Sequence, residues 1–130
     1  MREGRLTYIF RNRTKKFAAS IIRLYVKLPK GREEIHVCGK QMLRSGTSVA
    51  AHTREASRAR SEAEFVSKLG GALQEADETQ LWLELLREEC GIAAELTQPI
   101  ENESDELIAI MTTMIRKTEI RKAEIKKAES

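Results

Sequence analysis

Three side chains in this sequence have the chemistry to bind a transition metal: His36, Cys38 and Cys90. Cys90 lies just after the end of one helical segment, and His36 and Cys38 lie near the start of another. If these two segments are antiparallel, all three side chains are at the same end of the bundle. However, residues two apart on a helix point about 200° away from each other, and no fourth ligand is evident. We therefore expect two packed thiols and no metal. So few cysteines fit a reducing compartment, the cytoplasm.

Carboxylates, hydroxyls and glycines in the middle of the chain suit other kinds of catalytic site, but their spacing argues against each. Di-metal bundles need a Glu-x-x-His motif on each of two helices, a condition that the two histidines do not meet. The hydroxyl residues between 45 and 48 have no neighbouring general base. Gly70 and Gly71 interrupt a helical pattern instead of opening a helix, so they are no phosphate loop. The sequence predicts no enzyme and no cofactor, and His52 is expected to be a hydrogen-bonded histidine of the bundle.

Two amphipathic patterns fill the first half of the chain. Apolar residues at helical spacing predict a first helix from Phe17 to Leu28, which Pro29 and Gly31 end. A second helix is expected from about Glu33 to Ser57, because its apolar and small residues alternate at spacings of four and three.

Two more helices are expected in the second half. Ser61 and Glu64 have the spacing of a capping box, which places the start of the third helix there, and Gly91 suits its end. Thr97 is the expected N-cap of the fourth helix, with Pro99 in the first turn, where proline is tolerated.

The length of 130 residues fits one domain. Short connections between helices of similar length favour antiparallel neighbours, so we predict an all-α, up-down-up-down four-helix bundle. Its expected limits are residues 13–117, with residues 1–12 as a basic N-terminal extension and residues 118–130 as a charged repeat tail. No apolar stretch approaches the roughly 20 residues of a membrane span, so no membrane partner is expected.

A register between the second and third helices follows from their short connection. Residues at one level should have numbers that sum to about 120, which places the small residues 47–49 beside residues 70–72. Gly70 and Gly71 would then allow the two backbones to approach closely. Two interhelical ion pairs follow from the same register, Arg44 with Glu75 and Glu55 with Lys68.

Charge is divided along the chain. Residues 1–60 hold 15 Lys/Arg and 4 Asp/Glu, whereas residues 61–110 hold 2 and 13. Such a division favours self-association between basic and acidic surfaces, and anionic partners for any basic surface that stays uncovered. The alternative is an ordinary mixture of solvated faces.

Two apolar features exceed what one bundle needs. Trp82 lies among leucines at 81, 83, 85 and 86, which cover more of the helix circumference than one core seam. Either the fourth helix or a second subunit must bury the excess. In the tail, Ile115, Ile120 and Ile125 recur every five residues, about 140° apart around a helix, so the tail is either a solvated helical extension or a basic arm for RNA phosphates.

The stretch from residue 40 to residue 86 resembles a bacterial family of four-helix-bundle proteins first noted in intervening sequences of 23S ribosomal RNA genes. The segments that carry the resemblance are 44–49, 54–56, 61–68 and 75–86. The resemblance implies a bundle that assembles into a ring, commonly a homopentamer, with no established enzymatic activity and an association with nucleic acid. A related group acts as accessory factors of retroelements, which bind a reverse transcriptase. His52 departs from the asparagine that relatives commonly carry.

These observations predict a non-enzymatic, oligomeric bundle that binds RNA or DNA with low sequence specificity. The alternative is a protein-binding adaptor or scaffold, for example an accessory subunit of a reverse transcriptase. The cations expected to contact phosphates are Arg13, Lys15, Lys16, Arg23, Lys27, Lys40, Arg54, Arg58 and Arg60. Residues expected to hold the bundle or its interfaces together are Arg44, Glu55, Gly70, Gly71, Glu75 and Trp82.

Overall fold

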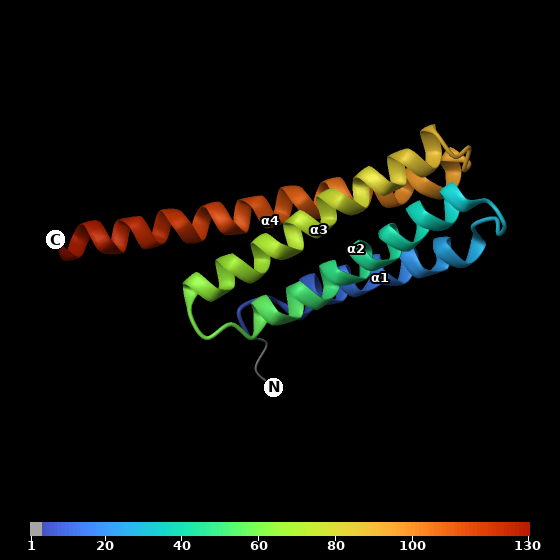
Figure 1. Cartoon of the computed structure of the whole chain (residues 1–130). Coiled ribbons are helices and arrows are strands. Elements are labelled where there is room, and N and C mark those ends of the chain that lie inside the picture. The colour runs from blue at the N-terminus through green and yellow to red at the C-terminus, as the bar shows by residue number, and fades with distance from the viewer. Residues whose placement is uncertain (1–3) are drawn as a thin grey trace.

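The computed structural model describes residues 4–130 and confirms the all-α fold (Figure 1). The helices are α1 (Tyr8–Lys27), α2 (Glu33–Ser57), α3 (Glu62–Glu88) and α4 (Ala94–Glu129). Within the described residues, no helix combines the length and the apolar character needed to cross a membrane.

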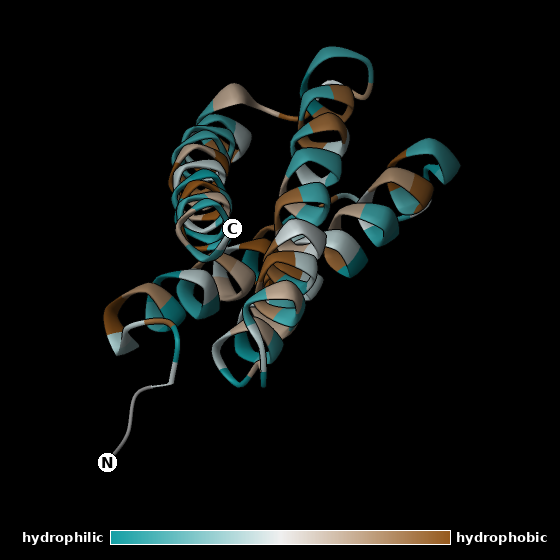
Figure 2. Cartoon of the chain, turned by 90° about the vertical axis from the view of Figure 1, so that its left-hand side faces the viewer, coloured by the Kyte–Doolittle hydropathy of each residue, from teal (hydrophilic) through white to brown (hydrophobic). Residues whose placement is uncertain are grey.

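The helices form an antiparallel bundle in which each packs against its sequence neighbours. α2 packs on α1 and on α3, α3 packs on α4, and α4 closes the bundle against α1. The turns alternate between the two ends, so α1 begins toward the same end of the bundle at which α4 ends (Figure 1). Apolar and polar segments alternate along every helix in Figure 2, as expected for helices with one buried side. The predicted up-down-up-down bundle is therefore confirmed.

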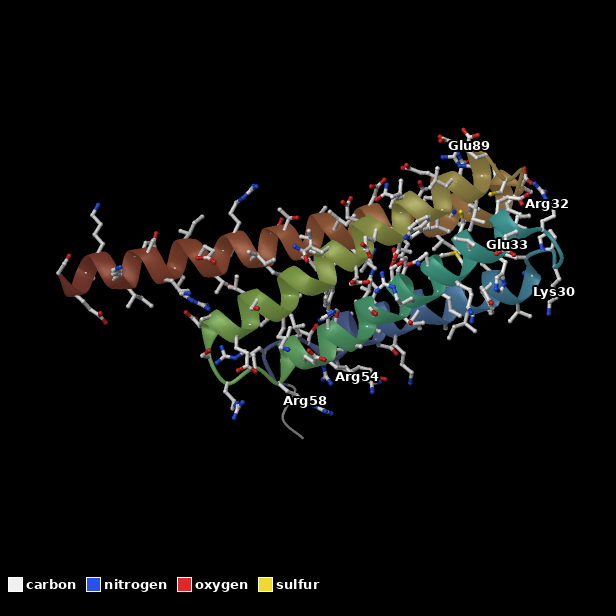
Figure 3. All side chains as sticks on the ribbon, viewed as in Figure 1. Lys30, Arg32, Glu33, Arg54, Arg58 and Glu89 are labelled. Carbon is white, nitrogen blue, oxygen red and sulfur yellow. The ribbon has the colours of Figure 1, made fainter. Side chains whose placement is uncertain are left out.

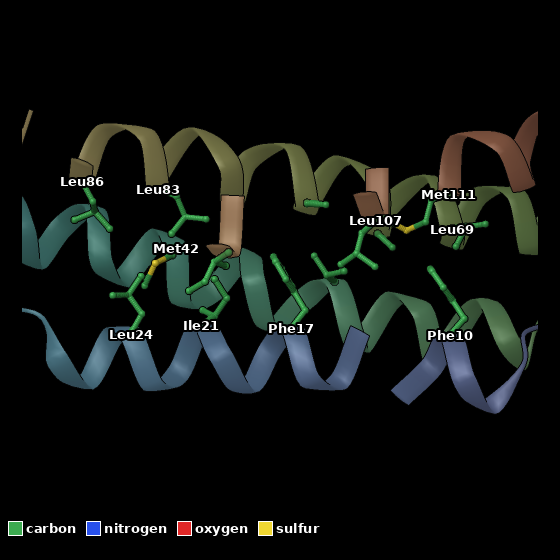
Figure 4. Close-up of a cluster of buried hydrophobic side chains, with 14 of the residues drawn as sticks. Phe10, Phe17, Ile21, Leu24, Met42, Leu69, Leu83, Leu86, Leu107 and Met111 are labelled. Carbon is green, nitrogen blue, oxygen red and sulfur yellow. The ribbon is translucent and has the colours of Figure 1, made fainter. Parts of the chain in front are cut away.

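One continuous apolar core runs along the bundle axis (Figure 4). All four helices contribute to it with side chains of helical spacing, and the largest of them are almost fully inaccessible to water. The core includes Phe17 and Ile21 from α1, Met42 from α2, Leu69, Leu83 and Leu86 from α3, and Leu107 and Met111 from α4. Burial of this kind supplies most of the stability of a helical bundle.

α1 begins earlier than the apolar pattern indicated. Thr7 caps the helix by accepting a hydrogen bond from the backbone N of Phe10 at 3.2 Å. Leu6 and Phe10 are both buried in the core. The bundle limit expected at residue 13 thus lies inside α1, and the described part of the expected N-terminal extension contributes core residues. Residues 1–3 of that extension lie outside the described residues.

α2 and the start of α3 agree with the sequence prediction. α2 covers Glu33–Ser57, and its two leading glutamates lie at the electropositive end of the helix dipole. The Ser61 hydroxyl accepts from the backbone N of Glu64 at 3.1 Å, as expected for the cap of α3. Gly91 follows α3 with a left-handed φ of 75°, a conformation that glycine adopts without strain.

α4 differs from the prediction at its start. The helix begins at Ala94, so Thr97 is not the N-cap; it lies inside the helix and is fully buried. Pro99 is an interior residue, not a first-turn residue. Since proline has no N–H, it leaves the carbonyl four residues earlier without its helical donor. The helix then continues without a break through the charged repeat to Glu129.

A layer of hydroxyl side chains crosses the middle of the apolar core. Thr79 Oγ1 on α3 is hydrogen-bonded to Ser45 Oγ on α2 at 2.9 Å. On the other side of α3, Ser104 Oγ donates to the carbonyl O of Ala76 at 2.9 Å. All three hydroxyl residues are fully buried. α3 is therefore linked by buried hydrogen bonds to both of its neighbours.

Small residues allow close approach at two helix contacts, only one of which was expected. A Cβ on Gly71 would lie 3.1 Å from Nδ1 of His52, so α2 and α3 do approach closely there. The side chain nearest to a Cβ on Gly71 is that of His52, not one from the predicted run 47–49. A Cβ on Gly70 would meet nothing within 4 Å. A second close contact is between α1 and α2, where a Cβ on Gly46 would lie 2.7 Å from Ile21.

Candidate nucleic-acid interface

Four of the predicted phosphate ligands lie on α1. Lys16, Arg23 and Lys27 are separated by seven and four residues, so they share one side of the helix, with Lys15 beside them. All four side chains are exposed. Among the described residues, no acidic side chain lies within ion-pair distance of any of them.

Three further cations follow the outer side of α2. Lys40, Arg54 and Arg58 are separated by 14 and four residues, close to whole helical turns, and all are exposed without a recorded acidic partner. Arg54 and Arg58 point outward from the last turns of α2 in Figure 3. Arg60 follows in the α2–α3 turn, with Nε only 3.9 Å from Glu64 but its side chain 91% exposed. The outer surfaces of α1 and α2 therefore present a group of solvated cations, which we call the α1–α2 basic surface: Lys15, Lys16, Arg23, Lys27, Lys40, Arg54 and Arg58.

Arg13 differs from the other predicted phosphate ligands, because it is held within the bundle. Its guanidinium donates to both carboxylate oxygens of Glu103 at 2.8 Å and to Glu106 at 2.5 Å. The hydrogen bond to Glu103 is the main reason that the pKa of Arg13 is raised, and the pKa of Glu103 is lowered in turn. The sequence did not reveal these partners, which lie about 90 residues away on α4. Arg13 therefore links α1 to α4 and is less accessible to an external anion.

The two ion pairs predicted between α2 and α3 are present. Arg44 Nη1 lies 3.4 Å from Glu75 Oε2, and Nη2 lies 2.8 Å from Glu78 Oε2. Lys68 Nζ lies 3.0 Å from Glu55 Oε2 and holds the pKa of Glu55 below its ordinary value. These pairs neutralise Arg44 of α2 and Lys68 of α3 at the contact between the two helices. The cations on the outer side of α2 are left in contact with water.

α3 and α4 carry most of the acidic residues. One pair between them is partly buried: Arg87 donates through Nε and Nη2 to the two carboxylate oxygens of Glu101, both at 3.0 Å. On the outer side of α3, Asp77, Glu78 and Glu88 are exposed. The division of charge along the sequence thus becomes a division between the α1–α2 and α3–α4 sides of the bundle.

Exposed apolar side chains accompany the cations of α1. Val26 is 67% exposed and Ile22 is 46% exposed, on the same helix as Lys15 and Arg23. Tyr8 and Ile9 are also exposed in the first turn. α1 therefore presents apolar area to solvent that a partner could cover.

Trp82 and its leucine neighbours are covered mainly within the chain. Leu83 and Leu86 are fully buried, and the partly buried Trp82 packs against the core. The Nε1 atom of Trp82 is inaccessible to water and has no hydrogen-bond partner among the described residues. Leu81 remains 48% exposed. The chain itself therefore buries most of the apolar side chains near the end of α3, and of the residues around Trp82 only Leu81 is left for a second molecule to cover.

The side chains considered for metal binding lie on separate parts of the bundle surface and core, apart from the two cysteines. Cys90 contributes to the raised pKa of the Cys38 thiol, so the two thiols lie near each other, but no three metal-ligand side chains come together among residues 4–130, and His36 is exposed. His52 Nδ1 lacks the expected hydrogen bond, because the nearest carboxylate oxygen, of Glu55, is 3.9 Å away.

Comparison with known proteins supports the same fold. The model of the family described as 23S rRNA-intervening sequence protein matches residues 7–113. A crystal structure of a protein of unknown function, from the S23 ribosomal protein family of Bacteroides thetaiotaomicron, is 40% identical in sequence. The match covers 83% of this chain and 96% of that chain, with a TM-score of 0.75. No curated protein shows significant similarity to the chain. Neither matching description names a catalytic activity, and the extent of the family match leads to one assignment: the chain belongs to the 23S rRNA-intervening sequence protein family.

Proposed function

We propose that this protein is a non-enzymatic binding protein whose α1–α2 basic surface holds RNA or DNA through phosphate contacts. The single observation that carries the proposal is that seven exposed cations lie on two adjacent helices without acidic partners in the described chain. The bundle neutralises Arg13, Arg44 and Arg87 internally but leaves these seven to water. Lysine and arginine contacts to phosphate carry little sequence information, so binding is weakly specific.

The number of cations sets the expected salt dependence. Neutralising Z phosphates makes log affinity fall with log salt at a slope of about −0.9Z on duplex DNA. Seven cations spread over two sides of a narrow bundle do not all reach one ligand. We therefore expect about 3–6 contacts and micromolar or weaker binding at physiological salt.

The test is a salt titration of binding to RNA and DNA with two matched arginine variants. Arg54→Gln removes a solvated cation of α2 and should flatten the slope by about 0.9. Arg44→Gln removes a cation from the same helix that Glu75 and Glu78 already neutralise, so it should leave the slope unchanged. The triple variant of Arg54, Arg58 and Arg60 to Gln should flatten the slope by two to three times as much as Arg54→Gln. If the wild-type protein binds neither RNA nor DNA at about 50 mM salt, the proposal is wrong.

A second candidate function is that of a protein-binding adaptor, which the exposed apolar residues of α1 favour. Ile22 and Val26 lie among the cations, and an apolar patch with a charged rim is typical of protein interfaces. In this second candidate, we propose that the chain associates with itself through α1–α2 of one copy and α3–α4 of the next, an arrangement that would cover the α1–α2 basic surface and compete with nucleic acid for it. The family resemblance implies five subunits in a closed ring. An adaptor that uses this surface for proteins alone would recover one partner protein and show no affinity for nucleic acid.

A further inference from the structure

α4 projects beyond the rest of the bundle. Arg121 on α4 forms an ion pair with Glu62, the first residue of α3. The residues after 121 therefore continue past the level at which α3 begins, over about 12 Å for eight residues at 1.5 Å each. Figure 1 shows this part of α4 without a neighbouring helix. We call residues 122–129 the α4 extension; it lies outside the region that matches the family model.

The α4 extension and the turn before it are ringed by cations. Residues 116–129 hold six Lys/Arg and three Glu. The five-residue repeat turns each successive pair of cations by about 140°, so positive charge faces several sides of the helix. Of these cations, only Arg121 has an ion-pair partner in the described chain.

The same repeat excludes two common uses of an exposed helix. A membrane-surface helix or a coiled-coil partner needs one continuous apolar side. Ile120 and Ile125 are about half exposed, but they point about 140° apart. A narrow rod with cations on several sides instead fits a space that is bordered by negative charge on both flanks.

The major groove of B-form DNA is such a space. It is about 12 Å wide, admits an α-helix, and has a phosphate backbone along each edge. The major groove of A-form RNA is too deep and narrow for side chains to reach into. We propose that the α4 extension enters the major groove of double-stranded DNA and contacts phosphates of both strands. This inference rests on the proposed nucleic-acid function and names duplex DNA as its ligand.

The charge around the base of the α4 extension agrees with this assignment. The end of the bundle from which it projects comprises residues 4–14, 50–72 and 112–130, which hold 13 Lys/Arg and 6 Asp/Glu. The opposite end, residues 20–42 and 80–103, holds 6 and 8. Arg58 and Arg60 are exposed at the same end of the bundle, and they would meet phosphates outside the groove.

The decisive experiment compares duplexes of DNA and RNA with the same sequence and length. The triple variant Lys122→Gln, Lys126→Gln, Lys127→Gln removes three unpaired cations of the α4 extension. On duplex DNA it should flatten the slope of log affinity against log salt by about 2–3, since each lost phosphate contact accounts for about 0.9. On duplex RNA it should leave the slope unchanged, because the helix does not enter that groove.

A charge-preserving variant and a folding measurement complete the design. Replacing the same three lysines by arginine should retain wild-type binding to DNA, and circular dichroism and light scattering should show that both variants keep the wild-type helix content and mass. Unchanged DNA binding by the glutamine variant would overturn the inference while leaving the proposed function intact. An equal loss on DNA and RNA would overturn it too, because net charge alone would then account for the effect. Absence of any binding by the wild-type protein would instead refute the proposed function.

Discussion

Arg87 on α3 and Glu101 on α4 are joined by two parallel hydrogen bonds of 3.0 Å at the edge of the core. Glu101 is one of the few acidic residues of the described chain that is buried, and the hydrogen bonds from Arg87 are the main reason that its pKa lies below the ordinary 4.5. A carboxyl group with a depressed pKa stabilises the folded state above its unfolded pKa. That stabilisation is lost as the pH falls through the folded pKa.

Glu101→Gln should therefore destabilise the bundle in a pH-dependent way. At pH 7 the loss of a charged hydrogen-bond partner should cost about 1–3 kcal/mol. The difference from the wild type should begin to shrink as the pH falls below 4.5, where the unfolded carboxyl takes up a proton, and should be lost below the depressed pKa of folded Glu101. Thermal unfolding of the wild type and the variant between pH 7 and pH 3 measures this difference in stability. The control is Glu88→Gln, since Glu88 lies 3.7 Å from Arg87 and is exposed. A difference that stays constant with pH would argue against the role given to this pair.

Gly70 and Gly71 should respond differently to the same substitution. Alanine is favoured over glycine in a helix by about 0.5–1 kcal/mol, and a Cβ at position 70 meets nothing within 4 Å. Gly70→Ala should therefore stabilise the protein by that amount. Gly71→Ala should stabilise it less, because its Cβ would press on the ring of His52 at 3.1 Å.

A second background separates helix propensity from packing at this contact. In a His52→Ala protein the ring is absent, so Gly71→Ala should gain as much as Gly70→Ala. Urea denaturation of Gly70→Ala, Gly71→Ala, His52→Ala and the double variant of His52 and Gly71 gives the free energies of unfolding to be compared. Equal gains for both glycines in the wild-type background would show that the α2–α3 contact at His52 is not tight.

The proposed self-association predicts a discrete mass in solution. Light scattering at moderate salt should give a whole-number multiple of 14.8 kDa. The double variant Ile22→Glu, Val26→Glu should weaken the assembly, because it places charge in the exposed apolar patch of α1. Ile125→Glu is the control, since Ile125 is similarly exposed at 51% but lies on the α4 extension. A wild-type protein that remains monomeric across the micromolar range would refute self-association.

The two cysteines should react slowly in the folded protein. Burial raises the pKa of Cys38 above its ordinary 9.0, with a further contribution from the neighbouring Cys90, so the reactive thiolate is scarce at neutral pH. A thiol reagent at pH 8 should label the native protein far more slowly than the protein in urea. Because the folded pKa of Cys38 is raised, the contribution of its neutral thiol to folding is fully present below pH 9 and is lost as the pH rises through the folded value. Rapid labelling of both cysteines without denaturant would contradict the packed arrangement.

The sequence predicted best those helices whose limits depend on local chemistry. The Ser61 cap and the Pro29 break depend on residues a few positions apart, and both ends of α2 were correct. The start of α1 was missed because Leu6 and Phe10 are separated from Phe17 by a mainly polar, basic run that hides the stripe. The start of α4 was missed because Thr97 looks like a cap, but the fold buries it in the core.

The candidate interface was harder to predict, because a cation's availability depends on what lies opposite it. The register between α2 and α3 follows from a short turn, so the Arg44–Glu75 pair could be foreseen. Arg13 and Glu103 face each other only because the first and last helices close the bundle, which no short connection fixes. Arg13 and Lys16 therefore look equivalent in sequence, although only Lys16 stays solvated.

The hydroxyl layer at Ser45, Thr79 and Ser104 restricts how the bundle can be misassembled. A purely apolar interface tolerates a slip of one helix along another by a heptad, because leucines replace leucines. Here such a slip would break two buried interhelical hydrogen bonds, from Thr79 to Ser45 and from Ser104 to the carbonyl of Ala76, at about 0.5–1.5 kcal/mol each. The Ser45 and Thr79 hydroxyls would keep hydrogen bonds to carbonyls of their own helices. Because α3 takes part in both interhelical bonds, these bonds fix the axial positions of α2 and α4 relative to the same helix.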